Sequence, residues 1–515
     1  MKFPRASGIL LHPSSLPGPF GIGDLGDAAY RWVDFLSDAG QSYWQVLPLS
    51  PTGYGDSPYQ GLSALAGNPM LISPQKLVER GHLSPSDLEG APPLPEGRCD
   101  YGAVIGYKNR LLDLAFERFR AYAPAEEHEA LARFCDEQAG WLEDVALFMA
   151  LKEAHNYSPW YDWDADLKRR QPSAMTHWKA LLLNRVQAQQ YRQWQFFTQW
   201  SDVKRYANEH GIRIIGDIPI FVSRDSADVW ANPHLFYFDE GLNPTVVSGV
   251  PPDYFSATGQ LWGHPLYRWD VMEAEGYAWW IQRFRMALTQ ADVLRIDHFR
   301  GFYNYWEVPA GEETAVNGRW RLGPGSALFR AVEAALGQVA IIAEDLGSFD
   351  REARAGLDAL EQEFGFPGMK VLQFAFDSGP RNDYLPHNYT RPECVVYTGT
   401  HDNDTIVGWY QNTASEKARD YVRRYIGCSG ADIAWDLIRL AWSSIAETAI
   451  TTAQDLLSLG HEARLNTPST SGAPNWCWRL VPGALPSWVA PRLHDLTFVY
   501  GRLPAEPEEE EESKT

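Results

Sequence analysis

The sequence contains few cysteines and few positive charges for its length. Its five cysteines are scattered along 515 residues, and no two of them have the CxxC spacing. We therefore expect free thiols, not disulfides or a zinc site. Lysine and arginine total 45 against 66 aspartates and glutamates, which gives a net charge of −21. This imbalance argues against nucleic acid and anionic membrane surfaces as partners, because both require clustered positive charge.

Long apolar runs are missing as well. No stretch approaches the ~18 consecutive apolar residues that a membrane-spanning helix needs. The first five residues lead into a short apolar stretch that Pro13 and Pro17 interrupt, and this pattern lacks the shape of a signal peptide. We therefore expect a cytoplasmic protein, and we favour a monomer.

Three common catalytic motifs are also missing. Nothing in the chain matches the phosphate loop GxxxxGK[ST], the serine-nucleophile turn GxSxG or the zinc motif HExxH. Asp402 and Asp404 flank Asn403 and could contribute to a metal site, but no ligand spacing requires one. We expect neither a metal nor a cofactor.

Aromatic residues, by contrast, are abundant. The chain has 21 Trp, 24 Tyr and 23 Phe, and many of them stand beside Gly, Pro and Asp in segments expected to be loops. An example is the turn-rich segment 51–60, which follows a short apolar strand and carries two tyrosines. Aromatic faces on loops suit the apolar C–H faces of sugar rings, although a large core and ordinary surface aromatics would also account for the composition.

Short apolar segments alternate with helical patterns along most of the chain. Eight of them read as strands, and helical segments such as 28–39, 279–287, 325–336 and 420–425 lie between them. This alternation predicts an α/β fold, a (β/α)8 TIM barrel. The expected strands are 8–13, 43–49, 213–221, 293–299, 340–347, 370–376, 394–402 and 449–457.

Insertions are expected to interrupt this barrel. Residues 72–205 carry long helical segments (103–121, 127–154 and 172–208), too many for one loop, so we predict a mainly helical insertion between strands 2 and 3. The remainder forms a single catalytic unit over residues 1–500, with a second, lid-bearing insertion at 222–285. Residues 501–515 include an unbroken glutamate run and are expected to form a disordered acidic tail.

The segment 293–299 combines a buried strand with charged side chains. Val293, Leu294 and Ile296 are apolar, and Arg295 and Asp297 stand two positions apart, so both point to one side of a strand. An aspartate leaving the carboxyl end of a parallel strand is typical of the active end of a TIM barrel. Asp297 is therefore a candidate nucleophile, although a structural Arg–Asp pair inside the barrel would show the same pattern.

Four predicted strands end on acidic residues: Asp217, Asp297, Glu344 and Asp402. In a barrel these ends meet at one rim, so residues far apart in the sequence converge. Core strands avoid carboxylates because burying an unpaired charge is costly. Two of these ends lie beside histidines, His298 and His401. Their ring nitrogens can form hydrogen bonds with sugar hydroxyls, although structural hydrogen bonding would explain both residues equally well.

Glycoside chemistry requires two carboxyl groups with different proton affinities. Arg295 is expected to hold Asp297 ionised, while the apolar residues before Glu344 are expected to raise its pKa. Asp297 would then attack the anomeric carbon and Glu344 would protonate the leaving oxygen. Asp402 would bind sugar hydroxyls and favour the distorted ring.

Several motifs together make the chain resemble glycoside hydrolase family 77, the 4-α-glucanotransferases, also called amylomaltases or disproportionating enzymes. They extend from the second strand to Arg479, and only 36 residues follow, which agrees with a family that lacks a C-terminal β-domain. The matching motifs are residues 51–59 (PTGYGDSPY), 216–220 (GDIPI), 249–253 (GVPPD), 295–298 (RIDH), 343–347 (AEDLG), 401–403 (HDN) and 475–479 (NWCWR).

The resemblance implies roles for particular residues. Asp297 corresponds to the nucleophile, Glu344 to the acid/base and Asp402 to the transition-state stabiliser. The segment 249–262 resembles the family's flexible lid over the acceptor side, and Tyr54 and Tyr101 match positions of a second glucan-binding groove. The residues expected to contact sugar are Tyr59, Asp217, Trp262, Arg295, His298, His401 and Asn475.

We therefore expect retaining transfer of an α-1,4-glucan from a donor to glucose or to another glucan, with cyclisation as a further outcome. α-1,4-Glucans and maltooligosaccharides are the expected partners. One alternative is an α-glucan hydrolase on the same scaffold, against which the lid and the missing β-domain argue. Another is a glucan-binding protein without activity, against which the three candidate carboxylates argue.

Overall fold

The computed structural model describes residues 3–252, 256–347 and 349–504, and its centre is a closed barrel of eight parallel strands. The order around the barrel is β1-β12-β11-β10-β9-β6-β3-β2, so neighbours in space follow one another in the chain once two insertions are set aside. This confirms the predicted (β/α)8 barrel. The strands are β1 (Ala6–Leu10), β2 (Tyr43–Gln45), β3 (Arg213–Pro219), β6 (Val293–Asp297), β9 (Ile341–Ala343), β10 (Gly368–Val371), β11 (Cys394–Tyr397) and β12 (Thr448–Thr452).

Several strands end earlier than predicted. The strand expected over 394–402 stops at Tyr397, and the one expected over 449–457 stops at Thr452. The second difference has a local cause, because the Thr452 hydroxyl accepts the backbone N–H of Asp455 at 3.1 Å and caps helix α18 (Ala453–Leu456). The acidic residues predicted at strand ends therefore lie partly on the loops that follow.

Helices surround the barrel and alternate with its strands. Apolar faces of these helices pack against the strands, and the side chains of Trp44, Trp200 and Trp280 are fully buried. Within the described residues, no helix has the length and apolar character needed to cross a membrane. The outer helices are α1 (Asp27–Asp38), α9 (Ala227–Ala231), α10 (Trp269–Ala274), α11 (Ala278–Gln290), α12 (Arg300–Tyr303), α13 (Ser326–Leu336), α14 (Arg351–Phe364), α15 (Ile406–Gly408), α16 (Glu416–Ile426), α17 (Ile433–Ser443) and α19 (Val489–Val499).

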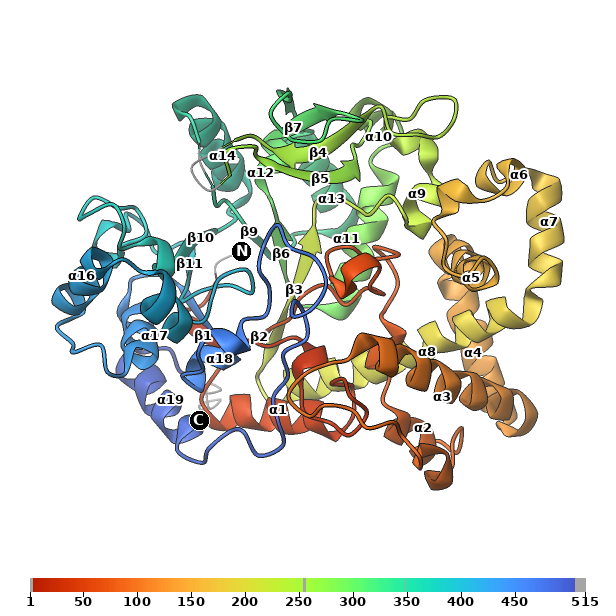
Figure 1. Ribbon diagram of the computed structural model, residues 1–515, viewed down its shortest axis with the longest axis horizontal. Coiled ribbons are helices and arrows are strands. Elements are labelled where there is room, and N and C mark those ends of the chain that lie inside the picture. The colour runs from red at the N-terminus through yellow and green to blue at the C-terminus, as the bar shows by residue number, and fades with distance from the viewer. Residues whose placement is uncertain (1–2, 253–255, 348, 505–515) are drawn as a thin grey trace, which may run out of the picture.

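A helical layer lies between β2 and β3 and stands to the right of the barrel in Figure 1. Two of its predicted helices are each divided in two, at Gln138 and at Leu182. The long last helix joins this layer to the barrel, since its Trp200 indole donates to the carbonyl of Gln290 at 2.9 Å. The helices are α2 (Pro74–Glu79), α3 (Tyr101–Tyr122), α4 (Ala125–Glu137), α5 (Ala139–Ala154), α6 (Ala165–Lys168), α7 (Pro172–Leu181) and α8 (Leu183–Glu209).

A small antiparallel sheet, visible at the top of Figure 1, was not predicted. Its order is β5 (Gln260–Pro265), β4 (Val246–Val250), β7 (Asn304–Pro309) and β8 (Arg319–Leu322), so it draws strands from both sides of β6. The segment 249–262, predicted as a loop, is therefore the tip of a hairpin, in which Gly249 pairs with Leu261 and Val250 with Gln260. Residues 253–255 of this segment lie outside the described residues.

The folded body extends beyond the predicted boundary at residue 500. Arg502 is fully buried, and its guanidinium donates to the carbonyls of Ala6 at 2.9 Å and Glu447 at 3.0 Å, beside the start of β1. The predicted tail, residues 501–515, thus overlaps the folded body at Arg502, whose guanidinium binds carbonyls at the start of β1 and just before β12. The predicted acidic tail over 505–515 lies outside the described residues.

Candidate active site

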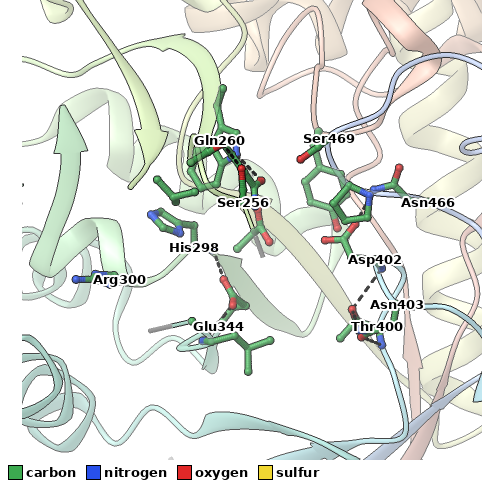
Figure 2. Close-up of a pocket in the computed structure, with 18 of the residues that line it drawn as sticks. Ser256, Gln260, His298, Arg300, Glu344, Thr400, Asp402, Asn403, Asn466 and Ser469 are labelled. Atoms are coloured by element: carbon green, nitrogen blue, oxygen red, sulfur yellow. Dashed lines mark hydrogen bonds between the residues drawn. The ribbon is translucent and has the colours of Figure 1, made fainter. Parts of the chain in front are cut away.

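A cavity of about 1250 Å³ opens at the carboxyl ends of the barrel strands. Figure 2 shows its two walls, with His298 and Glu344 on one side and Asp402 and Asn466 on the other. The hairpin of β4 and β5 covers one edge through Val250, Gln260 and Trp262. A large cleft at this end of a barrel is where TIM-barrel enzymes hold their catalytic groups.

Arg295 connects two of the predicted carboxylates. One of its nitrogens donates to both oxygens of Asp217, at 2.8 and 2.6 Å, and the other donates to Asp297 at 3.1 Å. Asp217 also accepts the hydroxyl of Tyr59 at 2.7 Å, and its side chain has no exposed area. Asp217 therefore lies beneath the cavity and holds Arg295 and Tyr59, so in this arrangement it does not offer the sugar contact that the sequence suggested.

The pKa of Asp297 is raised to about 6, which differs from the sequence-based expectation. Burial is the largest cause; Arg295 lowers the pKa, but the charges of Asp217 and Asp402 raise it. Arg295 is mainly engaged by Asp217, so it offsets only part of this effect. The Asp297 side chain is 28% exposed and borders the cavity, as a nucleophile must.

Glu344 follows β9 and is held by two backbone donors. It accepts the N–H of His298 at 2.7 Å and the N–H of Leu346 at 3.1 Å. Burial raises its pKa to about 8, and the negative charge of Asp297 adds to the shift. The expected asymmetry is therefore present, with Glu344 keeping its proton to a higher pH than Asp297.

His298 turns the chain at the end of β6. Its φ of 54° places it in the left-handed region, which is uncommon for residues other than glycine. A residue held in this region carries backbone strain. This turn directs its backbone N–H to Glu344, while its ring lies edge-on to Trp262 with centroids 4.8 Å apart. Burial, and then the charge of Arg300, lower the imidazole pKa to about 3, so the ring is neutral near pH 7.

Asp402 lies on the opposite wall with a side chain that is 43% exposed. It accepts the amide of Asn466 at 2.6 Å, and the same oxygen lies 3.4 Å from Nε2 of His401. His401 stacks on Tyr59 with centroids 4.9 Å apart, and Trp476 packs against both rings. Three aromatic rings thus form the floor between Asp402 and Asp217.

Comparison with known proteins agrees with this arrangement. The family model described as 4-alpha-glucanotransferase matches residues 11–483. The chain belongs to this family. It is 52% identical to the 4-alpha-glucanotransferase of Synechocystis over 97% of the chain and 98% of the relative, and 50% identical to that of Thermus thermophilus over 98% and 100%.

Solved structures give the same result. The amylomaltase from Streptococcus agalactiae in complex with acarbose superposes with a TM-score of 0.93 at 38% identity, covering 97% of this chain and all of that one. The amylomaltase from Corynebacterium glutamicum, at 18% identity, matches with a TM-score of 0.76 over 97% of this chain and 75% of that one, and supports the fold. The resemblance stated from the motifs is confirmed, and the chain is an enzyme of the 4-alpha-glucanotransferase family.

Two residues expected to contact glucan, Asn475 at the cavity and Tyr101 in the second groove, are largely buried in this structure. Asn475 is 4% exposed and bonds within its own loop, accepting the N–H of Thr467 at 3.0 Å and donating to the hydroxyl of Thr470 at 2.8 Å. Tyr101 is 8% exposed, and its hydroxyl donates to the carbonyl of Trp476 at 3.1 Å, so its ring face is not open to a sugar here. The side chain of Tyr54, its predicted companion, lies outside the described residues.

Other cavity residues had not been singled out from the sequence. Trp476 borders the cavity and directly follows Asn475 in the motif 475–479, so this motif is the sequence signal that marks it. Asn466 belongs to no motif and no signal marked it. Arg300 stacks on Trp320 of the small sheet, 3.8 Å from the ring centre, and could not be placed without that sheet.

Metal ligation has no visible basis in the described part of the chain. There, no group of three or more His, Cys, Asp or Glu side chains is arranged to hold a metal ion. Asp404, one half of the acidic pair considered above, bonds to Nδ1 of His461 at 2.7 Å and is 7% exposed.

Proposed function

We propose that the chain transfers a segment of an α-1,4-glucan from a donor chain to the 4-hydroxyl of glucose or of another α-1,4-glucan. The observation that carries this proposal is the pairing of Asp297 and Glu344. They border one cavity, their pKa values are raised unequally, and the backbone of His298 lies between them. Membership of the 4-alpha-glucanotransferase family supplies the substrate class.

The first step forms a covalent intermediate. A carboxylate oxygen of Asp297 attacks the anomeric carbon of the donor as the bond to the leaving oxygen breaks, and Glu344 gives its proton to that oxygen. The departing chain leaves with a free 4-hydroxyl. Asp402, on the opposite wall, binds hydroxyls of the reacting sugar as positive charge develops at the anomeric carbon.

The second step reverses these roles. Glu344, now ionised, takes the proton of the acceptor hydroxyl, whose oxygen attacks the anomeric carbon and releases Asp297. Two inversions retain the α configuration. Retention requires the two carboxyl groups to lie about 5–5.5 Å apart, whereas an inverting enzyme needs ~6.5–9.5 Å for a water molecule between them.

The hairpin tip supports transfer over hydrolysis. Val250, Gln260 and Trp262 line the cavity from the small sheet, so an acceptor sugar bound there would lie between Trp262 and the catalytic pair. A covering element that excludes water protects the covalent intermediate until an acceptor arrives. The same cover permits cyclisation when the acceptor is the other end of the bound chain.

Incubation with maltotriose alone tests the proposal. Transfer predicts glucose together with maltopentaose and longer chains. Glucose and maltose without longer products would mean that water is the acceptor, and the hydrolase alternative would replace the transferase. No change in maltotriose, with binding detected by calorimetry, would leave a glucan-binding protein without activity.

A further inference from the structure

The segment 461–476 lies against the loop that carries Asp402. Arg464 donates to the backbone carbonyl of Asp402 at 2.8 Å and to the carbonyl of Asn466 at 2.7 Å. The Arg464 guanidinium therefore links the backbone of Asp402 to the backbone of Asn466. Because this segment borders the cavity through Asn466 and Trp476, its geometry acts directly on the candidate stabiliser.

Asn466 then fixes the carboxylate itself. Its amide nitrogen donates to Oδ1 of Asp402 at 2.6 Å, a short, charge-assisted hydrogen bond. His401 also approaches Oδ1, at 3.4 Å. Both contacts reach one oxygen, so Oδ2 is the atom with which the half-exposed carboxylate can accept a sugar hydroxyl. Figure 2 shows Asn466 beside Asp402, across the cavity from Glu344.

We propose that Asn466 is a positioning residue, which holds Asp402 in the rotamer that presents Oδ2 to the reacting sugar. This inference rests on the proposed glucan transfer and adds a residue to it. Asn466 acts through Asp402: its neutral N–H donor keeps Oδ1 occupied while leaving the pair with a single negative charge. A misplaced catalytic group typically costs up to ~10²-fold in rate, so we expect a loss of roughly 10- to 100-fold in kcat for Asn466→Ala.

The isosteric change Asn466→Asp separates positioning from simple packing. Two carboxylates whose oxygens lie 2.6 Å apart cannot both stay ionised, so the pair takes up one proton as the pH falls. The protonated pair has an O–H donor where the amide N–H stood and the same single negative charge. The ratio of variant to wild-type kcat should therefore rise as the pH is lowered from 8 to 5, whereas the ratio for Asn466→Ala should stay flat.

Asn208 provides a matched control at the other end of the barrel. Its amide nitrogen also donates to an aspartate, Asp292, at 2.9 Å, but this pair is exposed and precedes β6. Asn208→Asp should keep wild-type kcat at every pH. Thermal unfolding of all variants at each pH checks that lost activity does not reflect lost fold.

The assay is maltotriose disproportionation followed by product chain length. A rising ratio for Asn466→Asp with a flat ratio for Asn466→Ala supports the inference. A flat ratio for Asn466→Asp, or wild-type kcat in Asn466→Ala, overturns it. If wild type itself makes no chains longer than maltotriose, the proposed transfer fails, and this result is distinct because it appears before any variant is compared.

Discussion

The backbone N–H of His298 donates to Glu344 at 2.7 Å, and His298 directly follows Asp297 in the chain. The candidate acid/base is therefore bonded to the peptide that carries the candidate nucleophile. This contact fixes the two carboxyl groups relative to one another without a further side chain. His298 adopts a left-handed conformation to make this hydrogen bond, and this conformation carries backbone strain.

The pKa values of this pair predict the pH profile of transfer. Asp297 must be ionised to attack and Glu344 must be protonated to donate, so kcat/KM should fall below about pH 6 and above about pH 8. Steady-state rates between pH 4 and 10 measure both limbs. A flat profile across pH 5–9 would contradict the assignment of these two groups.

Removing the charge of Asp217 should move one limb of that profile. Its negative charge raises the pKa of Asp297, so Asp217→Asn should lower that pKa and shift the acid limb to lower pH. Because Arg295 also loses its main partner, we expect kcat to fall roughly 10- to 100-fold through misplacement of the cavity floor. An unchanged acid limb would show that the charge of Asp217 does not reach Asp297.

Glu344 also predicts a pH-dependent effect on stability. Its pKa is raised in the folded protein, so the fold retains a proton that the unfolded chain releases above about 4.5. Stability linked to this group is thus fully present below that pH and is lost as the pH rises toward about 8. Glu344→Gln mimics the protonated form, so its gain in melting temperature over wild type should grow between pH 4.5 and 8.

The test is whether the gain in melting temperature of Glu344→Gln grows or shrinks as the pH rises. Glu363→Gln on α14 is a suitable control, because the Glu363 side chain is partly exposed and pairs with the exposed Arg330 at 2.6 Å. It should show no gain that grows with pH. A gain for Glu344→Gln that shrinks as the pH rises would mean that the carboxylate form of Glu344 is favoured in the folded protein.

Trp262 predicts the balance between transfer and hydrolysis. It lies on β5 at the cavity and edge-on to His298, where an acceptor sugar would stack on it. Trp262→Ala should weaken acceptor binding by about 0.5–1.5 kcal/mol, or roughly 2- to 10-fold in KM for the acceptor, and raise the share of hydrolysis. Leu322→Ala on β8, whose side chain is 76% exposed, is the control in the same sheet. An unchanged ratio of transfer to hydrolysis products in Trp262→Ala would show that the hairpin does not control access of water to the intermediate.

The barrel could be predicted because its strands are local apolar runs that alternate with helical patterns, and all eight are present. The small sheet could not, because β4 and β5 are separated from β7 and β8 by β6, and their pairing depends on tertiary contacts. Asp217 shows the corresponding limit in the site. Its place near the carboxyl end of β3 was predictable, but whether it faces sugar or Arg295 depends on rotamers and burial that the sequence does not contain.

The covalent intermediate on Asp297 tests the central claim most directly. An α-maltotriosyl fluoride loses fluoride without needing an acid, so Glu344→Gln should still glycosylate Asp297 but should lack the base that the second step requires. Mass spectrometry should then find one maltotriosyl unit on the peptide that contains residues 293–299, and none in the double variant with Asp297→Asn. Release of fluoride with β-configured maltotriose and no adduct would contradict the retaining mechanism.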